Sequence, residues 1–198
     1  MPQTHKTLYT GKAHTAGGGD GSSRRDDGRL DVKLSPPDTS LSGTWNVLGV
    51  LIEFLAGPGD TQSDTALVRG TMRGGVIVPL HSHADQELIY VVGGSLEVFL
   101  ETHGWHTVGV GEVAVIAGNK KHALRNATAG DVTTIAFTGG DLYDFFRDLA
   151  VPAEPNQYPV ITPSTPEQMK ELLETNAKYG YWLASREENA EIGIHLPG

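Results

Sequence analysis

The stretch GVIVPLHSHADQELIYVVGG, residues 75–94, decides the fold of this chain. It begins as a β-prone run in which His81 and His83 lie two residues apart, so both imidazoles point to the same face if the strand is continuous. Glu87 keeps that parity, and a turn at residues 84–85 would also bring it back beside the histidines. Apolar residues flank this polar group on both sides, which predicts that it lies within a core. Two imidazoles and a carboxylate on one inner wall suit a divalent transition metal ion.

A second stretch, GEVAVIAGNKKHALRN at residues 111–126, supplies a fourth candidate ligand. His122 is predicted to lie on a strand after a tight turn, and in a closed barrel that strand can face the first one across the interior. Three neutral imidazoles and one carboxylate leave one or two positions open on a five- or six-coordinate ion. Open positions are typical of catalytic rather than structural metal sites. The alternative is a set of core histidines, each of which would need buried hydrogen-bond partners.

Both stretches resemble the two motifs of the cupin superfamily. The first fits the pattern G(X)5HXH(X)3-4E(X)6G, with matches at Gly75, His81, His83, Glu87 and Gly94. The second fits the pattern G(X)5PXG(X)2H(X)3N, with matches at Gly111, His122 and Asn126. It departs from the pattern where the family has Pro and Gly, here Ala117 and Asn119. Since Asn tolerates the left-handed conformation better than most residues, the turn is expected to form. The resemblance covers about residues 44–140 and implies the metal ligands His81, His83, Glu87 and His122.

Short β-prone runs separated by turn residues continue from residue 44 to residue 138. The chain has 25 glycines and 11 prolines, which favours many short strands, and no long helical pattern separates the runs. We therefore expect an all-β fold, which the resemblance specifies as a double-stranded β-helix, the jelly-roll barrel of cupins. Alternation along the strands predicts a set of apolar residues that line the barrel: Val76, Val78, Ile89, Val91, Val113, Val115, Ile135 and Phe137.

Two short helices are expected after the barrel, packed on its outside. The first would begin at an N-cap Asp141 and bury the face formed by Leu142, Phe145, Phe146 and Leu149. The second would begin at Thr165 with proline in its first position and end at Gly180. Its apolar face is predicted to consist of Met169, Leu172, Leu173 and Ala177. The expected segments are thus a leader at 1–42, a barrel at 43–140 and a helical extension with a tail at 141–198.

The leader is rich in glycine and polar residues, and two alternating runs within it predict a β-hairpin arm; a disordered tail is the alternative. Residues 8–37 are similar to the N-terminal hairpin of the organic hydroperoxide resistance (Ohr/OsmC-like) proteins. The arginine of that family's GGRDG motif is Gly19 here, and its reactive cysteines are missing because the chain has no cysteine. A thiol peroxidase is therefore excluded. We expect a structural hairpin that adds strands to the barrel edge or crosses to a second subunit.

Composition excludes several other classes. The 198 residues carry 24 acidic and 15 basic side chains, a net charge of −9, which disfavours binding to nucleic acid or an anionic membrane surface. The absence of cysteine excludes disulfides and thiolate chemistry. No stretch has the length and hydrophobicity of a signal peptide core or a membrane span. We expect a cytoplasmic protein, a homodimer, with a small-molecule substrate.

The resemblance implies a mono-cupin, and the chain looks most like the quercetin-dioxygenase-like members. That likeness implies a metal-dependent oxidoreductase, a dioxygenase acting on a small chelating substrate such as a polyphenol or diketone. One ion of Fe, Mn, Ni or Zn would be held by the three histidines, and Glu87 would be a ligand that also detaches to act as a general base. Because fold does not fix function, two alternatives remain. They are a zinc-dependent cyclase or isomerase and a non-catalytic cupin that binds a metal or small ligand.

Overall fold

The computed structural model describes residues 13–16, 22–25, 31–33, 43–153 and 165–196. The chain divides into two units, residues 1–40 and residues 41–198. Each unit is described by itself below.

The described strands of the first unit form a three-stranded antiparallel sheet in the order β1-β2-β3. Their bounds are β1 (Ala13–Ala16), β2 (Ser22–Arg25) and β3 (Asp31–Lys33). The described residues of the two runs expected to form a hairpin lie in β1 and β3, and each of these strands pairs with the short polar strand β2 between them. Most of residues 8–37 lie outside the described residues, so the likeness to the hydroperoxide resistance hairpin stays a prediction.

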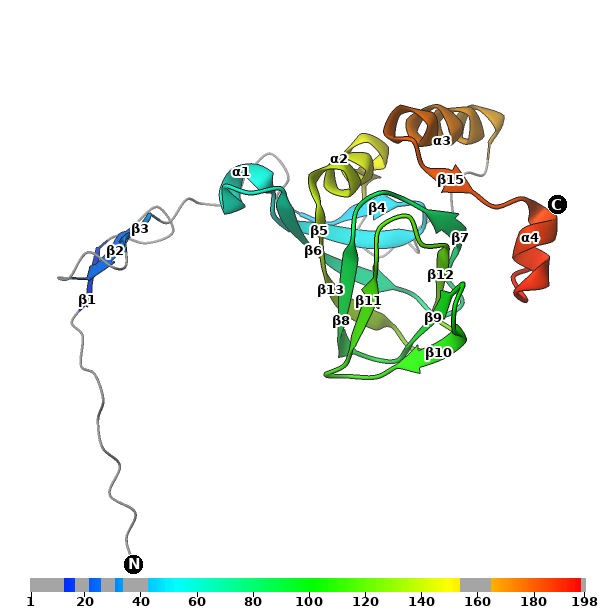
Figure 1. Cartoon of the computed structure of the whole chain (residues 1–198), viewed down its shortest axis with the longest axis horizontal. Helices are drawn as coiled ribbons and strands as arrows, with labels where there is room; N and C mark the ends of the chain where they lie inside the picture. Colours follow the sequence, from blue (N-terminus) through cyan, green and yellow to red (C-terminus); the bar gives the residue numbers. More distant parts are fainter. Residues whose placement is uncertain (1–12, 17–21, 26–30, 34–42, 154–164, 197–198) are drawn as a thin grey trace, which may run out of the picture. The chain divides into compact units, whose positions relative to one another are not determined.

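The second unit contains two sheets of mostly antiparallel strands, which confirms the expected double-stranded β-helix. The first sheet runs β10-β9-β12-β7-β15, with bounds β7 (Ile77–Ser82), β9 (Leu96–Leu100), β10 (Gly104–Val108), β12 (His122–Arg125) and β15 (Trp182–Leu183). The second runs β11-β8-β13-β6-β5-β4-β14, with bounds β4 (Trp45–Val47), β5 (Val50–Ala56), β6 (Thr65–Met72), β8 (Glu87–Gly93), β11 (Val113–Ile116), β13 (Val132–Gly139) and β14 (Val151–Pro152). Strands β9, β10 and β12 lie opposite β8, β11 and β13 in the barrel (Figure 1).

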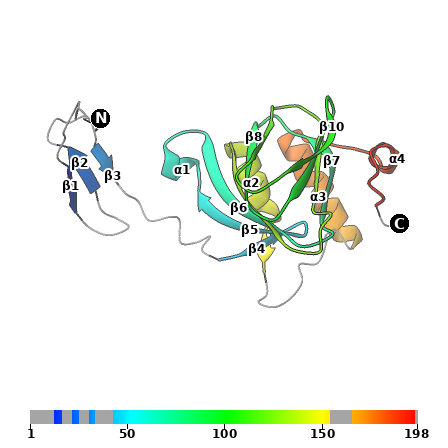
Figure 2. The ribbon, with the colours of Figure 1, turned by 90° about the horizontal axis from the view of Figure 1, so that it is seen from below.

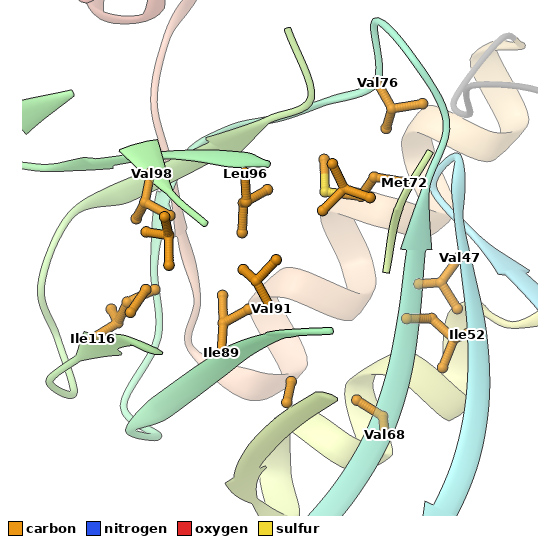
Figure 3. Close-up of a cluster of buried hydrophobic side chains, with 14 of the residues drawn as sticks. Val47, Ile52, Val68, Met72, Val76, Ile89, Val91, Leu96, Val98 and Ile116 are labelled. Atoms are coloured by element: carbon orange, nitrogen blue, oxygen red, sulfur yellow. The ribbon is translucent and has the colours of Figure 1, made fainter. Parts of the chain in front are cut away.

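The space between the two sheets is filled by aliphatic side chains (Figure 3). Val91 from one sheet and Leu96 and Val98 from the other are each 0% exposed, and Ile89 and Ile116 are almost as deeply buried. Removing side chains of this size from water stabilises the fold by about 1.5–3 kcal/mol each. The barrel therefore holds its strands through a dry core, which extends to the polar group described in the next section.

Part of the predicted lining is wrong. Val76, Ile89 and Val91 are buried as expected, Val78 and Ile135 are half-buried, and Val113, Val115 and Phe137 are exposed. The buried residues of β11 and β13 are instead Ala114, Ile116, Val132, Thr134, Ala136 and Thr138. The alternation of residues along a strand determines which side chains share a face. Which of the two faces points into the core is determined by how the strand pairs with its neighbours. Ala114 and Ala136 both lie opposite Ile89, so they share its inward direction.

Within the described residues, the helices are α1 (Pro58–Thr61), α2 (Gly140–Leu149), α3 (Pro166–Tyr179) and α4 (Arg186–Glu191). Helix α2 packs on β6 and β13, and α3 packs on α2 (Figure 2). Both expected helices are thus present on the outside of the barrel. None of the helices in the described ranges combines the length and hydrophobicity needed to span a bilayer.

Helix α2 buries Leu142 and Phe145 of the predicted face, whereas Phe146 and Leu149 are half-buried and Tyr143 is buried in addition. Its N-terminus also differs from the prediction. The N-cap is Gly139, and Asp141 lies in the first turn. Two carboxylates from distant loops accept hydrogen bonds from the first backbone amides. Asp64 accepts from Gly140 N at 3.2 Å and Asp85 from Leu142 N at 2.5 Å. A sequence pattern for a local cap cannot reveal carboxylates that approach through the tertiary fold.

Helix α3 has the predicted ends and a different buried face. The Thr165 side chain accepts from Gln168 N, and Gly180 ends the helix with a φ of 68°. Met169 and Leu173 are exposed, and the buried residue is Asn176. The helix thus packs through a face that includes Asn176, whose carbonyl accepts from Tyr181 N at 2.9 Å.

The C-terminal segment extends the first sheet, an arrangement that the sequence analysis missed. Strand β15 pairs with β7, and the backbone amide of Ala184 donates to the carbonyl of Leu80 at 3.0 Å. The fully buried Asn189 accepts from Leu80 N at 2.9 Å. Ser185 and Glu188 form a capping box at the start of α4, a pattern that is visible in the sequence. The segment therefore supports β7 next to its histidines.

Candidate metal centre

Two of the three candidate histidines come from neighbouring strands of one sheet. His122 at the start of β12 lies opposite His81 near the end of β7, with ring centroids 4.2 Å apart. The expectation that the His122 strand lies across the interior from the first strand is wrong, because the two strands are hydrogen-bonded neighbours. The pairing shifts register between His122 and Leu124. Such irregularities re-aim side chains next to functional sites.

His83 lies just past the end of β7 and completes a group of three imidazoles. One ring nitrogen from each of His81, His83 and His122 lies within 4.8 Å of the others, a spacing that could hold a metal ion. His83 and His122 are 3% and 1% exposed, whereas His81 is half-buried. His83 and His122 are therefore shielded from solvent, and His81 is the most exposed of the three histidines.

Glu87 reaches the same group from the other sheet, where it begins β8. The chain bends at Ala84 and Asp85, as the sequence suggested, before β8 starts. The Oε2 atom of Glu87 lies 3.8 Å from Nε2 of His83 and 3.7 Å from Nε2 of His122. The structure thus brings all four sequence-predicted ligand residues together between the two sheets.

Hydrogen bonds on the far side of each ring determine which nitrogen is free. The Nδ1 atoms of His81, His83 and His122 donate to the backbone carbonyls of Pro79, Asp85 and Lys120, at 2.7, 2.9 and 2.8 Å. In a neutral imidazole the other nitrogen, Nε2, then carries the lone pair. The Nε2 atoms of His83 and His122 are buried and have no hydrogen-bond partner among the described residues. Oriented imidazoles with free Nε2 atoms are the arrangement that metal-binding histidines show.

The distances between the Glu87 oxygen and the two histidine nitrogens also suit ligands that share one metal ion. Nitrogen and oxygen ligands lie about 2.0–2.2 Å from a divalent metal, so two ligands of one ion are about 3.0–3.4 Å apart. The distances of 3.7 and 3.8 Å from Glu87 to the two nitrogens are slightly longer than this. Small rotations of the side chains close the difference, so the residues fit a metal ion.

Burial favours the neutral form of two of the imidazoles, those of His81 and His122. Burial lowers the pKa of His81 well below its usual range, and the neighbouring His122 and His83 lower it further. Burial also lowers the pKa of His122, although the carboxylate of Glu87 opposes that change. Neutral imidazoles are the form that binds metal, so the site is prepared for an ion at neutral pH.

These pKa shifts predict that the metal-free protein loses stability as the pH falls below 6.5, the ordinary value for histidine. In that range the unfolded chain takes up protons that the folded chain does not, so acidification favours unfolding. Each such histidine contributes a slope of about 1.4 kcal/mol per pH unit until its folded-state pKa is reached. Urea unfolding of chelator-treated protein at pH 6.5 and 5.5 measures the effect. In the variant His81→Gln, the change of unfolding free energy with pH should be smaller by the contribution of about one histidine. A pH dependence equal to that of wild type would contradict the lowered pKa of His81.

The turn before β12 holds the loop of His83 in place. Asn119 adopts a φ of 63°, which confirms the expectation that this turn forms without the family's glycine. Its backbone amide donates to the carbonyl of His83 at 2.6 Å. Beside it, a Cβ atom added to Gly118 would lie 2.0 Å from the carbonyl oxygen of Ala84. The turn and the His83 loop therefore pack backbone against backbone.

We expect Gly118→Ala to lower the free energy of unfolding by about 3 kcal/mol, because the added methyl group forces the two backbones apart. Metal retention should weaken with it, since His83 moves with its loop. Gly130→Ala is the matched control, because a Cβ atom at Gly130 has no neighbour within 4 Å. Urea denaturation measures the free energy of unfolding of both variants. Equal losses in the two variants would contradict the prediction, because they would show that the backbones accommodate a methyl group at residue 118.

The remaining motif residues have structural roles. Gly75, Gly94 and Gly111 take φ values of +82°, +81° and +85°, and a Cβ atom on Gly94 would lie 2.5 Å from the carbonyl oxygen of Asp131. Asn126 is buried and donates to the carbonyls of Met72 and Gly130 at 2.9 and 2.7 Å. The motif positions other than the four polar ligand residues thus shape turns that keep the strands in register.

Two residues near the site were not singled out in the sequence. Asp85 is joined to His83 through its carbonyl and to helix α2 through its carboxylate. The ring centroid of Tyr181 lies 5.5 Å from that of His83. Tyr181 follows the glycine that ends α3, and a cluster of aromatic residues after a helix stop, KYGYW at 178–182, is the only signal in the sequence. Asp85 occupies a variable position of the first motif, and Tyr181 approaches the site through long-range packing, so no motif position marks either residue.

A comparison with protein families agrees with the fold. Residues 69–138, about a third of the chain, match the family model described as a cupin domain. KdgF from a Halomonas species is 22% identical over 48% of this chain and 86% of its own, with a TM-score of 0.42. A predicted oxalate decarboxylase from Thermotoga maritima is 18% identical over 46% of this chain and 79% of its own, with a TM-score of 0.43. The DMSP lyase DddQ from Ruegeria pomeroyi is 24% identical over 48% of this chain and 46% of its own, with a TM-score of 0.38. No curated protein matches the chain.

Proposed function

We propose that this chain is a metal-dependent oxidoreductase, a dioxygenase that acts on a small chelating substrate of the polyphenol or diketone kind. The observation that carries the proposal is the convergence of three imidazoles on one point, with the buried Nε2 atoms of His83 and His122 lacking other partners in the described parts of the chain. The match of residues 69–138 to a cupin domain supports a metal site of this composition. His81, His83, Glu87 and His122 would hold the ion.

A divalent ion bound there would supply Lewis acidity toward an oxygen donor and, if it is redox-active, electrons for dioxygen chemistry. Four protein ligands would leave one or two positions on the ion, and detachment of Glu87 would free the further position needed to hold both a chelating substrate and dioxygen. In a dioxygenase both oxygen atoms enter the product and the substrate provides the electrons, so no separate reductant is required. The half-buried side of His81 is the open side of the group and would admit the substrate.

Glu87 would have a second role as the base. A chelating phenol or enol binds a metal best after it loses its proton, and a carboxylate within reach of two metal-binding nitrogens is well situated to accept that proton. The residue is 7% exposed, so the proton would be transferred away from bulk water. The aliphatic core around Ile89, Val91 and Ile116 would keep water from the reacting atoms.

Elemental analysis of untagged protein purified without chelators tests the metal, and oxygen uptake with polyphenols and β-diketones tests the reaction. Iron, manganese or nickel near one ion per chain together with oxygen consumption would support the proposal. Zinc at that level and a converted substrate without oxygen uptake would indicate a cyclase or isomerase instead. Ligand binding without turnover would indicate a binding protein and would overturn the enzymatic proposal.

A further inference from the structure

Tyr181, whose ring packs on that of His83, carries a buried hydroxyl group. Its Oη atom is shielded from solvent and has no hydrogen-bond partner in the part of the chain that the structure describes. A phenolic hydroxyl buried without a partner is unfavourable, and in folded proteins such groups are nearly always bonded to protein, water or ligand. The hydroxyl of Tyr181 is therefore a buried donor that a ligand at the neighbouring histidines could satisfy.

The backbone holds this residue beside the histidines. Tyr181 directly precedes β15, in which Trp182 lies opposite Ser82 and Leu183 lies opposite His81. The same register brings the Tyr181 ring next to that of His83, at 5.5 Å between centroids. Phe145 of α2 packs on the Tyr181 ring at 4.9 Å and Tyr179 packs on it at 5.8 Å. The ring is thus held by three aromatic neighbours from three parts of the fold.

A tyrosine phenol ordinarily loses its proton only near about pH 10. Its hydroxyl is therefore a hydrogen-bond donor throughout the physiological range. A donor of this kind, beside a metal centre with open positions, suits an oxygen atom that carries negative charge.

We propose that Tyr181 contacts the ligand bound at the three-histidine centre and donates its phenolic hydrogen to one of the ligand's oxygen atoms. This inference rests on the proposed function, because it requires a ligand on the metal. It adds a residue from the C-terminal segment, outside residues 69–138, to the site. The chemical class that fits is an oxygen chelator bound as its anion, such as a catecholate or enolate.

Tyr179 offers a matched control. It lies on the last turn of α3 and packs on the same Phe145 ring, at 5.9 Å. Its hydroxyl, however, donates to Asp148 at 2.8 Å and accepts from Lys178 at 3.2 Å, at the exposed surface. Removing that hydroxyl changes a surface contact, whereas removing the hydroxyl of Tyr181 changes the donor at the site.

The test uses the full chain, stripped with a chelator and loaded with Co²⁺, and 4-nitrocatechol as the chromophoric probe. Tyr181→Phe should bind the probe about tenfold more weakly than wild type, since a hydrogen bond to a charged group is lost. Its Co²⁺ affinity and Tm should stay at wild-type values, because the ring and its packing are kept. Tyr179→Phe should bind the probe as wild type does.

The outcomes separate this inference from the proposed function. Equal probe affinity in wild type and Tyr181→Phe, with Co²⁺ binding intact, would overturn the role of Tyr181 and leave the metal centre standing. Loss of Co²⁺ or a large drop in Tm in Tyr181→Phe would also overturn it, because the hydroxyl would then support the structure rather than the ligand. A wild-type protein that takes up no Co²⁺ would overturn the proposed function together with this inference.

Discussion

His122→Ala is expected to purify without metal, whereas wild-type protein retains about one ion per chain. The substitution removes a ligand from the centre of the group, since His122 lies 4.2 Å from the His81 ring and its Nε2 is 3.7 Å from Glu87. Loss of a residue that merely orients a ligand costs 10–100-fold in metal affinity in known sites, so loss of the ligand itself should cost more than about 100-fold. Elemental analysis after dialysis measures the difference.

Thermal unfolding gives a second measure that does not depend on metal surviving purification. A ligand that binds only the folded state stabilises it by mass action, by about 2.7 kcal/mol at a hundredfold excess over Kd. Wild-type Tm should therefore rise when metal is added to chelator-treated protein, and the Tm of His122→Ala should not respond. His103→Ala is the control, because the His103 side chain is exposed and its hydrogen bond in the described structure is to the neighbouring Thr102. Metal retained by His122→Ala, at the wild-type level, would refute the assignment of this ligand.

The four polar residues of this site could be predicted because they lie close together in sequence and the family resemblance is carried by their spacing. His81, His83 and Glu87 fall within seven residues, so strand and bend geometry alone brings them near one another. The left-handed turn at Asn119 was also predictable, since it depends on one residue's conformational preference. Features of this kind depend on residues that are close together in the sequence, so the sequence is enough to predict them.

What could not be predicted depends on contacts between distant segments. Asp85 caps α2 at a separation of 57 residues, and Asn189 binds the backbone of Leu80 at a separation of 109. The inner face of β11 was misassigned because Val113 and Val115 are as apolar as Ala114 and Ile116, and hydrophobicity alone cannot choose between them. The choice is made by pairing with β8, which no pattern within β11 reveals.

Glu87→Gln is expected to retain metal and to lose turnover by about 10²–10⁴-fold, the usual contribution of a general base. The amide has nearly the size and shape of the carboxylate, so the three imidazoles still meet at one point. It cannot, however, accept a proton from a phenol or enol. The measurement is oxygen uptake with the polyphenol or β-diketone that wild-type protein consumes fastest, together with the metal content of each preparation.

A second carboxylate separates this effect from a general loss of charge. Glu97 on β9 is half-buried and forms an ion pair with Arg125 outside the metal group, so Glu97→Gln should leave the turnover rate unchanged.

The two roles assigned to Glu87 also give different results. If it is both ligand and base, Glu87→Gln keeps most of its metal through the three histidines and fails in turnover. If metal and turnover vanish together, the carboxylate is needed to hold the ion, and the base must be another group. A rate above a tenth of wild type at full metal content would show that the substrate loses its proton without Glu87.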